Sequence, residues 1–111
     1  MSSAELVSVA ERIRAALRVV IDPELGYNIV DLGLIYDIAV DAAGAARVLM
    51  TTTTRGCPAT GYLQEGARHS ATQVAGVTSV EVVMTHAPPW SPQNMSSAAK
   101  QHFGIPEEST A

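Results

Sequence analysis

The spacing of apolar residues changes along this chain, and that change limits the folds it can form. From about residue 4 to residue 20, apolar side chains recur at steps of three and four, which is typical of one face of a helix. Pro23 ends this segment, and two stretches of alternating apolar and polar residues follow at 35–41 and 47–54. A glycine-containing turn separates these stretches, so the pattern predicts a helix and then a β-hairpin.

The second half of the chain shows the same change of spacing. A helix is predicted over 58–75, with Gly76 as the residue that ends it, and a third strand over 77–86. A short last helix is predicted over 96–103, before a glycine and a proline. The resulting order, α-β-β-α-β-α, predicts an α/β (α+β) two-layer sandwich, in which helices pack on one face of a small three-stranded mixed sheet.

Size and charge limit the class of protein. The chain has 111 residues, of which 47% are hydrophobic, so we expect one domain over 1–111, with a core at about 4–105 and a disordered tail at 106–111. The net charge is −4 and the seven lysines and arginines are scattered, which argues against a nucleic-acid surface. No run approaches the roughly 18 apolar residues that span a bilayer. Charged residues interrupt the first apolar segment, which is therefore not a signal peptide. We expect a cytoplasmic protein with no nucleic-acid and no membrane partner.

Cys57, the only cysteine, is the most informative candidate for chemistry. Pro58 follows it directly, and proline is favoured at the first position of a helix. Cys57 is therefore predicted to be the N-cap residue, with its sulfur beside unpaired backbone N–H groups. Such a thiol is placed for metal binding or nucleophilic chemistry. The plain alternative is a small, buried hydrophobic side chain.

Four short motifs, in this order, resemble one known family. They are Asp22-Pro23-Glu24-Leu25, Asp31-Leu32-Gly33-Leu34-Ile35-Tyr36, Thr51-Thr52-Thr53-Thr54-Arg55-Gly56-Cys57-Pro58 and Pro88-Pro89-Trp90-Ser91-Pro92. Together they are similar to the SufT/PaaD-like family of small iron–sulfur cluster assembly proteins, which includes a eukaryotic cytosolic iron–sulfur assembly component. The resemblance covers about residues 6–105. It implies a sandwich related to the cluster-assembly scaffold fold and a role in maturing or delivering clusters to client proteins.

The resemblance also implies which residues form the site. It places the family's motif cysteine on Cys57, followed by Pro58, its acidic turn on Asp22 and Glu24, and its threonine pair on Thr53 and Thr54. Each supporting residue has a structural alternative: the acids could cap a turn, and the threonines could be strand residues whose hydroxyls point to opposite faces. The chain departs from the family pattern at Arg55, where proline is common, and at Ala87, where an acidic residue often stands.

Trp90, the only tryptophan, lies in a proline-rich loop beside Pro89. One interpretation is that its indole covers the core, where it would bury a large apolar area. The other is that Pro89 and Trp90 bind a partner, because aromatic side chains dominate the energetics of many interfaces. The sequence leaves both open.

The number of cysteines limits what the site can hold. An iron–sulfur cluster ordinarily needs about four ligands, so one thiolate must share a cluster or an iron ion with another molecule. The leading interpretation is a non-enzymatic accessory factor that binds a cluster or iron transiently through Cys57, with no stably bound cofactor. Its implied partners are the iron–sulfur assembly machinery and client apo-proteins, and a homodimer is left open.

Three alternatives remain. The protein could be a pure adaptor that docks assembly machinery through the Pro-Pro-Trp loop, with a structural cysteine. It could be a thiol enzyme, although no Cys-x-x-Cys is present and no histidine is close to Cys57 in the sequence. It could be an accessory protein of phenylacetate degradation, but the cysteine-rich C-terminal extension of that branch is absent, which favours general cluster assembly.

Overall fold

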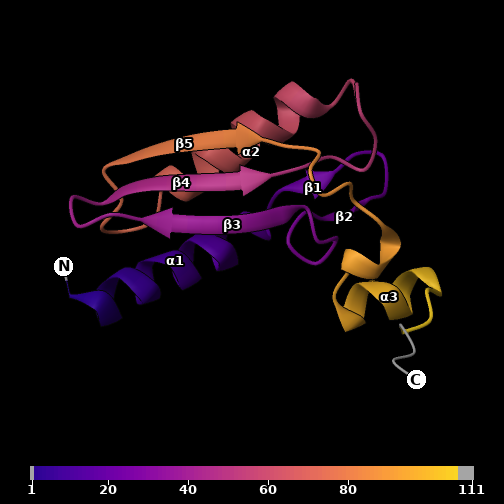
Figure 1. Ribbon diagram of the computed structural model, residues 1–111, viewed down its shortest axis with the longest axis horizontal. Coiled ribbons are helices and arrows are strands. Elements are labelled where there is room, and N and C mark those ends of the chain that lie inside the picture. The colour runs from indigo at the N-terminus through magenta and orange to yellow at the C-terminus, as the bar shows by residue number, and fades with distance from the viewer. Residues whose placement is uncertain (1, 108–111) are drawn as a thin grey trace.

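A three-stranded sheet forms the centre of the fold in a computed structural model, which describes residues 2–107 (Figure 1). Strand β3 (Ile35–Val40) pairs antiparallel with β4 (Ala45–Met50), and β4 pairs in parallel with β5 (Ser79–Met84). Val48 lies opposite Ile38 on one side and Val82 on the other. The predicted mixed sheet and its hairpin are confirmed.

Two helices cover one face of this sheet and form the second layer of the sandwich. Helix α1 (Ser3–Leu17) packs against β3 and helix α2 (Thr60–Thr72) against β5, and the two helices also contact each other (Figure 1). The side chains that they bury in the core are the apolar ones at helical spacing: Val9, Ile13 and Leu17 of α1, and Leu63, Ala67 and Ala71 of α2. They meet the inward-facing alternate residues of β4, which are Ala46, Val48 and Met50. No helix within residues 2–107 is long and apolar enough to cross a bilayer.

A smaller unit lies beyond one end of the sheet. It consists of the short antiparallel strands β1 (Ile21–Asp22) and β2 (Tyr27–Asn28), the 3₁₀ helix η1 (Pro92–Asn94) and helix α3 (Ser97–Phe103) (Figure 1). The ring of Tyr27 lies 4.9 Å from that of His102 and 5.5 Å from that of Phe103, so aromatic packing joins the hairpin to the helix. The sequence predicted α3 but only a turn where β1 and β2 pair.

The C-terminal end of the chain continues past α3. In the predicted tail, the carboxylate of Glu107 accepts a hydrogen bond of 3.1 Å from Nζ of the buried Lys100. The rest of the tail that was predicted to be disordered, residues 108–111, lies outside the described residues.

Most element boundaries differ by a few residues from the sequence-based prediction, and the largest difference is at the end of β4. Strand β4 ends at Met50 and does not continue to Thr54. The N–H of Thr51 still bonds to the carbonyl of Leu34 at 2.9 Å, but the hydroxyl of Thr52 then donates to the Thr54 carbonyl at 2.7 Å. This local bond competes with strand pairing and turns the chain away from the sheet. Helix α2 is also shorter than predicted, because it ends at Thr72.

Candidate site at the carboxyl ends of the parallel strands

The two parallel strands, β4 and β5, end at the same edge of the sheet. The N–H of Thr85 donates to the Met50 carbonyl at 2.9 Å, which ties the two strand ends together. The segment 51–59, which we call the cysteine loop, leaves β4 there and leads to α2 (Figure 1). In open α/β sheets, ligands typically bind outside the carboxyl ends of the parallel strands. The cysteine loop is therefore the candidate site.

The prediction that Cys57 is an N-cap residue is wrong. Helix α2 begins at Thr60, and its N-cap is Ala59, which makes no side-chain capping bond. Pro58 lies in a turn before the helix and not at its first position. The carbonyl of Cys57 accepts bonds from the N–H of Thr60 at 3.1 Å and from its hydroxyl at 2.7 Å, and these bonds close the turn. The Thr60 hydroxyl thus gives the chain an alternative to starting the helix at Pro58.

Cys57 is buried, but it does not belong to the hydrophobic core. The residue is a free cysteine with 7% exposure. Within the part of the chain that the structure describes, every other buried apolar residue is a member of the core cluster, and Cys57 is not. Its neighbours Arg55, Gly56 and Pro58 are exposed. Cys57 is therefore a buried residue within an otherwise largely exposed loop, outside the core cluster.

The acidic turn has a structural task. Asp22 is 1% exposed, and its Oδ1 accepts hydrogen bonds from the N–H groups of Glu24 at 2.7 Å and Leu25 at 3.1 Å. A carboxylate in this position caps the turn, which is the structural role that the sequence left open for Asp22. Glu24 itself is exposed. Between residues 2 and 107, no three His, Cys, Asp or Glu side chains are grouped so that they could hold a metal ion. Asp22, Glu24 and Cys57 are therefore not a three-ligand site.

Within the threonine run, Thr52 makes the contact that links the loop to the end of β5, although it was not among the predicted site residues. Thr52 is 1% exposed, and its hydroxyl lies 3.0 Å from Nε2 of His86, beyond the end of β5. Thr53 is half-buried and Thr54 is exposed. The predicted supporting role of the Thr53–Thr54 pair stays a prediction. Alternation along a strand could have placed Thr52 on the inner face, but no local pattern connects residue 52 with residue 86.

Trp90 is anchored inside the molecule. Its half-buried indole packs against the core, and Nε1 donates to the carbonyl of Leu32 at 2.7 Å. Nearby, the hydroxyl of Tyr36 donates to the carbonyl of Pro88 at 2.8 Å. These bonds join the Pro-Pro-Trp motif to the Asp31–Tyr36 motif, which favours the core-covering interpretation of Trp90. Partner binding by Trp90 and the exposed Pro89 stays a prediction.

The Asp31–Tyr36 motif also contacts the segment that leads to α3. The carbonyl of Asp31 accepts from the N–H of Ser96 at 2.8 Å, and its carboxylate accepts from Nδ2 of Asn28 at 2.8 Å. Gly33 has a φ of +79°, and a Cβ at this position would overlap the backbone of Asn94. Only glycine permits both the left-handed backbone and this close approach.

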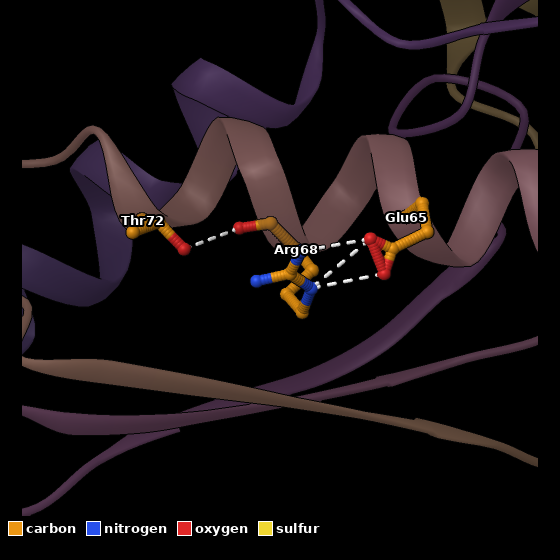
Figure 2. A network of polar contacts seen from close by, with 3 residues as sticks. All are labelled: Glu65, Arg68 and Thr72. Carbon is orange, nitrogen blue, oxygen red and sulfur yellow. Dashed lines mark hydrogen bonds and ion pairs between the residues drawn. The ribbon is translucent and has the colours of Figure 1, made fainter.

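The clearest electrostatic features lie on the outer surface of α2 (Figure 2). The guanidinium of Arg68 donates to the carboxylate of Glu65 at 2.8–3.2 Å, and Thr72 donates to the Arg68 carbonyl at 2.6 Å. The hydrogen bonds and charge of Arg68 hold the pKa of Glu65 below its ordinary value, and Glu65 raises the pKa of Arg68. These are exposed contacts between neighbours on a helix, so they support the helix and do not belong to the cysteine loop.

Comparison with known proteins agrees with the fold and the motifs. A family model described as "Iron-sulfur cluster assembly protein" matches residues 10–82. The Fe-S protein maturation auxiliary factor YitW of Bacillus subtilis is 38% identical over 98 residues, which is 88% of this chain and 96% of that protein. The auxiliary factor SufT of Staphylococcus aureus is 38% identical over 86 residues, covering 78% of this chain and 98% of SufT. The crystal structure of a domain of unknown function, DUF59, from Bacillus anthracis superposes with a TM-score of 0.89 at 37% identity, covering 95% of this chain and 100% of that one.

The small mixed-sheet sandwich with its candidate site at the ends of β4 and β5 thus defines a recognised class of domain. This chain belongs to the iron–sulfur cluster assembly protein family.

Proposed function

We propose that this protein is an accessory factor in iron–sulfur cluster assembly or delivery, and that Cys57 is a transient ligand shared with another molecule. Two relatives that align with most of the chain are named Fe-S protein maturation auxiliary factors, which supports the general role. The observation that carries the specific role is the position of Cys57. It is buried outside the core, in an exposed loop at the carboxyl ends of the parallel strands.

The available ligands favour transfer over storage. A two-iron or four-iron cluster ordinarily takes about four protein ligands, mostly cysteines, and this chain has one. Since residues 2–107 hold no three-residue metal group, the other ligands come from outside the fold described here. A client protein, the assembly machinery, a small thiol or a second copy of the chain can supply them. The cluster is then cargo, which leaves when a more complete set of ligands takes it over.

We also propose that the protein is not an enzyme. A nucleophilic cysteine is activated by an adjacent base, and no histidine is close to Cys57 in the sequence. Relatives along most of the chain are named auxiliary factors. The absence of any stable cofactor, the cytoplasmic location and the partners, namely the assembly machinery and client apo-proteins, belong to the same proposal. A homodimer is one source of a second thiolate.

Anaerobic reconstitution tests the thiol role. Wild-type protein and the Cys57→Ser variant are titrated with iron and sulfide in the presence of a small thiol, and the visible absorption of sulfur-to-iron charge transfer is recorded. We expect the absorption in the wild type and its loss in Cys57→Ser. A matched Arg55→Ala variant, which changes an exposed residue of the same loop but keeps the sulfur, should retain it. Equal absorption in wild type and Cys57→Ser would contradict the role of Cys57.

A test in cells addresses the accessory role. A strain that lacks the protein should show low activity of cluster-dependent enzymes at unchanged enzyme abundance, particularly under iron limitation. Cys57→Ser should fail to restore that activity, while Arg55→Ala restores it. Full restoration by Cys57→Ser would favour the pure adaptor, in which the cysteine is structural.

A further inference from the structure

The cysteine loop is held by very few backbone contacts. Between residues 52 and 59, no backbone N–H donates to a backbone carbonyl of the described residues. The loop contains Gly56, with a φ of +69°, and two exposed neighbours of Cys57, Arg55 and Pro58. Segments with few hydrogen bonds and exposed side chains open at low free energy. The side-chain bonds within the loop therefore have a large share in deciding its shape.

One such bond leads from the loop to β5. The hydroxyl of Thr52 donates its single proton to the carbonyl of Thr54 at 2.7 Å. The same oxygen lies 3.0 Å from Nε2 of His86. Because a hydroxyl has only one hydrogen to donate, the contact with His86 requires a proton on Nε2, which donates to the threonine oxygen. The bonds thus run in one direction, from His86 to Thr52 to the Thr54 carbonyl.

We propose that His86 is a positioning residue for Cys57, acting through Thr52. Its Nε2–H holds the Thr52 hydroxyl in the orientation that bends the loop at Thr54, and this bend sets the start of the path to Cys57. Thr52 is 1% exposed and His86 is half-buried, so the threonine hydroxyl has little access to water that could replace the bond. His86 follows β5 and Thr52 follows β4, and the Thr85–Met50 bond ties the ends of these strands together. The start of the cysteine loop is therefore held in a fixed position relative to the sheet.

The inference deepens the proposed function, since it names what presents the thiol, but its test is independent of iron or sulfide. The rate of Cys57 alkylation by iodoacetamide, at one pH, reports how often the loop opens. His86→Leu should raise this rate about fivefold, the factor that corresponds to a typical hydrogen bond of about 1 kcal/mol. His86→Gln, whose amide N–H can replace Nε2–H, should stay close to the wild-type rate.

Thr52→Val removes the other end of the contact with little change of shape. It should raise the alkylation rate by a similar factor, and the double variant Thr52→Val/His86→Leu should be no faster than Thr52→Val alone, because both changes break the same connection. Ile13→Val is the matched control. It removes a methyl group from the core, lowers the Tm and should leave the alkylation rate unchanged.

Three outcomes would overturn the inference. One is a wild-type alkylation rate in His86→Leu or in Thr52→Val. Another is a His86→Gln variant that reacts as fast as His86→Leu, which would mean that the ring fills space and the N–H is not needed. The last is an equal increase in Ile13→Val, which would assign the effect to global stability. If Cys57→Ser forms the cluster normally while the alkylation results hold, the proposed function fails and the positioning of the loop does not.

Discussion

Two regions that both carry family motifs are built in opposite ways. In the first, which we call the clamp, the Asp31–Tyr36 motif is bonded to the segment Pro88–Ser96 through the Trp90 indole, the Tyr36 hydroxyl and the Ser96 amide. In the second, the cysteine loop, no backbone N–H of residues 52–59 bonds to a backbone carbonyl of the described residues. The clamp motifs therefore stabilise the shape of the fold, whereas the loop motif places the buried Cys57 in a segment with few backbone hydrogen bonds.

The largest effect should follow a change at the centre of the clamp. Gly33→Ala adds a Cβ that overlaps the backbone of Asn94, at a φ of +79°. We expect a loss of about 2–3 kcal/mol in the free energy of unfolding, measured by urea denaturation. Gly26→Ala is the control, since Gly26 has a φ of +70° but open space around it, so only the backbone strain of about 1 kcal/mol applies. Equal losses in the two variants would mean that the close approach to Asn94 is unimportant.

A smaller effect should follow the loss of the indole bond. Trp90→Phe keeps an aromatic ring but removes the donor to the Leu32 carbonyl. We expect a loss of about 1–2 kcal/mol in the free energy of unfolding, with the Cys57 alkylation rate unchanged. Pull-down of assembly machinery by Trp90→Phe and by Pro89→Ala then tests the adaptor alternative. Normal stability with lost pull-down in Trp90→Phe would move this residue from the clamp to an interface.

The cysteine loop should show the reverse pattern. Cys57→Ser should change the free energy of unfolding by less than about 1 kcal/mol, because the side chain lies outside the core cluster. The same variant should abolish iron–sulfide absorption and the rescue of client enzymes. A loss of stability as large as that of Gly33→Ala would show that Cys57 is a packing residue, and the contrast between the two regions would disappear.

The smallest effect belongs to neither region and depends on pH. Arg68 lowers the pKa of Glu65 in the folded protein, so the pair stabilises α2 above the ordinary carboxyl pKa of 4.5, and this contribution is lost as pH falls through the lowered value. The Tm difference between wild type and Glu65→Gln should therefore be small near pH 6 and should vanish as the pH falls below the ordinary carboxyl range. The alkylation rate of Cys57, measured at one pH, should be the same in both proteins. A Tm difference that grows on acidification would contradict the assignment.

Much of the fold was predictable because its signals are local. The capping box joins Ser2 and Glu5, the helical spacing of α1 and α2 selects their buried faces, and Gly104 ends α3 with a φ of +71°. Each signal lies within a few residues, where steric and hydrogen-bonding preferences act without a distant partner. The candidate cysteine was also predictable, as the sole thiol within a recognisable motif.

The sequence-based boundaries at the start of α2 and the end of β4 were wrong because a side-chain hydrogen bond competed with the local backbone preference. The preference of Pro58 for the first turn of a helix was real, but the Thr60 hydroxyl bonds to the Cys57 carbonyl and the helix starts later. The alternation up to Thr54 predicted a longer strand, but the Thr52 hydroxyl bends the chain after Met50. Side chains that bond to the nearby backbone make such boundaries uncertain in any sequence.

Periodicity, capping residues and motif order were thus sufficient for the main helices and strands and for the family, because these signals lie within short stretches of the chain. They did not predict the β1–β2 pair. The structural tasks of individual motif residues depended instead on contacts between segments that lie far apart in the chain. Leu32 and Trp90 are 58 positions apart, and Thr52 and His86 are 34 apart. Such pairs form only when packing brings separate segments together, since the hydrogen bonds gain their value from the exclusion of water in the folded state. Folding therefore separated the motif residues that stabilise the fold from Cys57, which lies outside the core cluster.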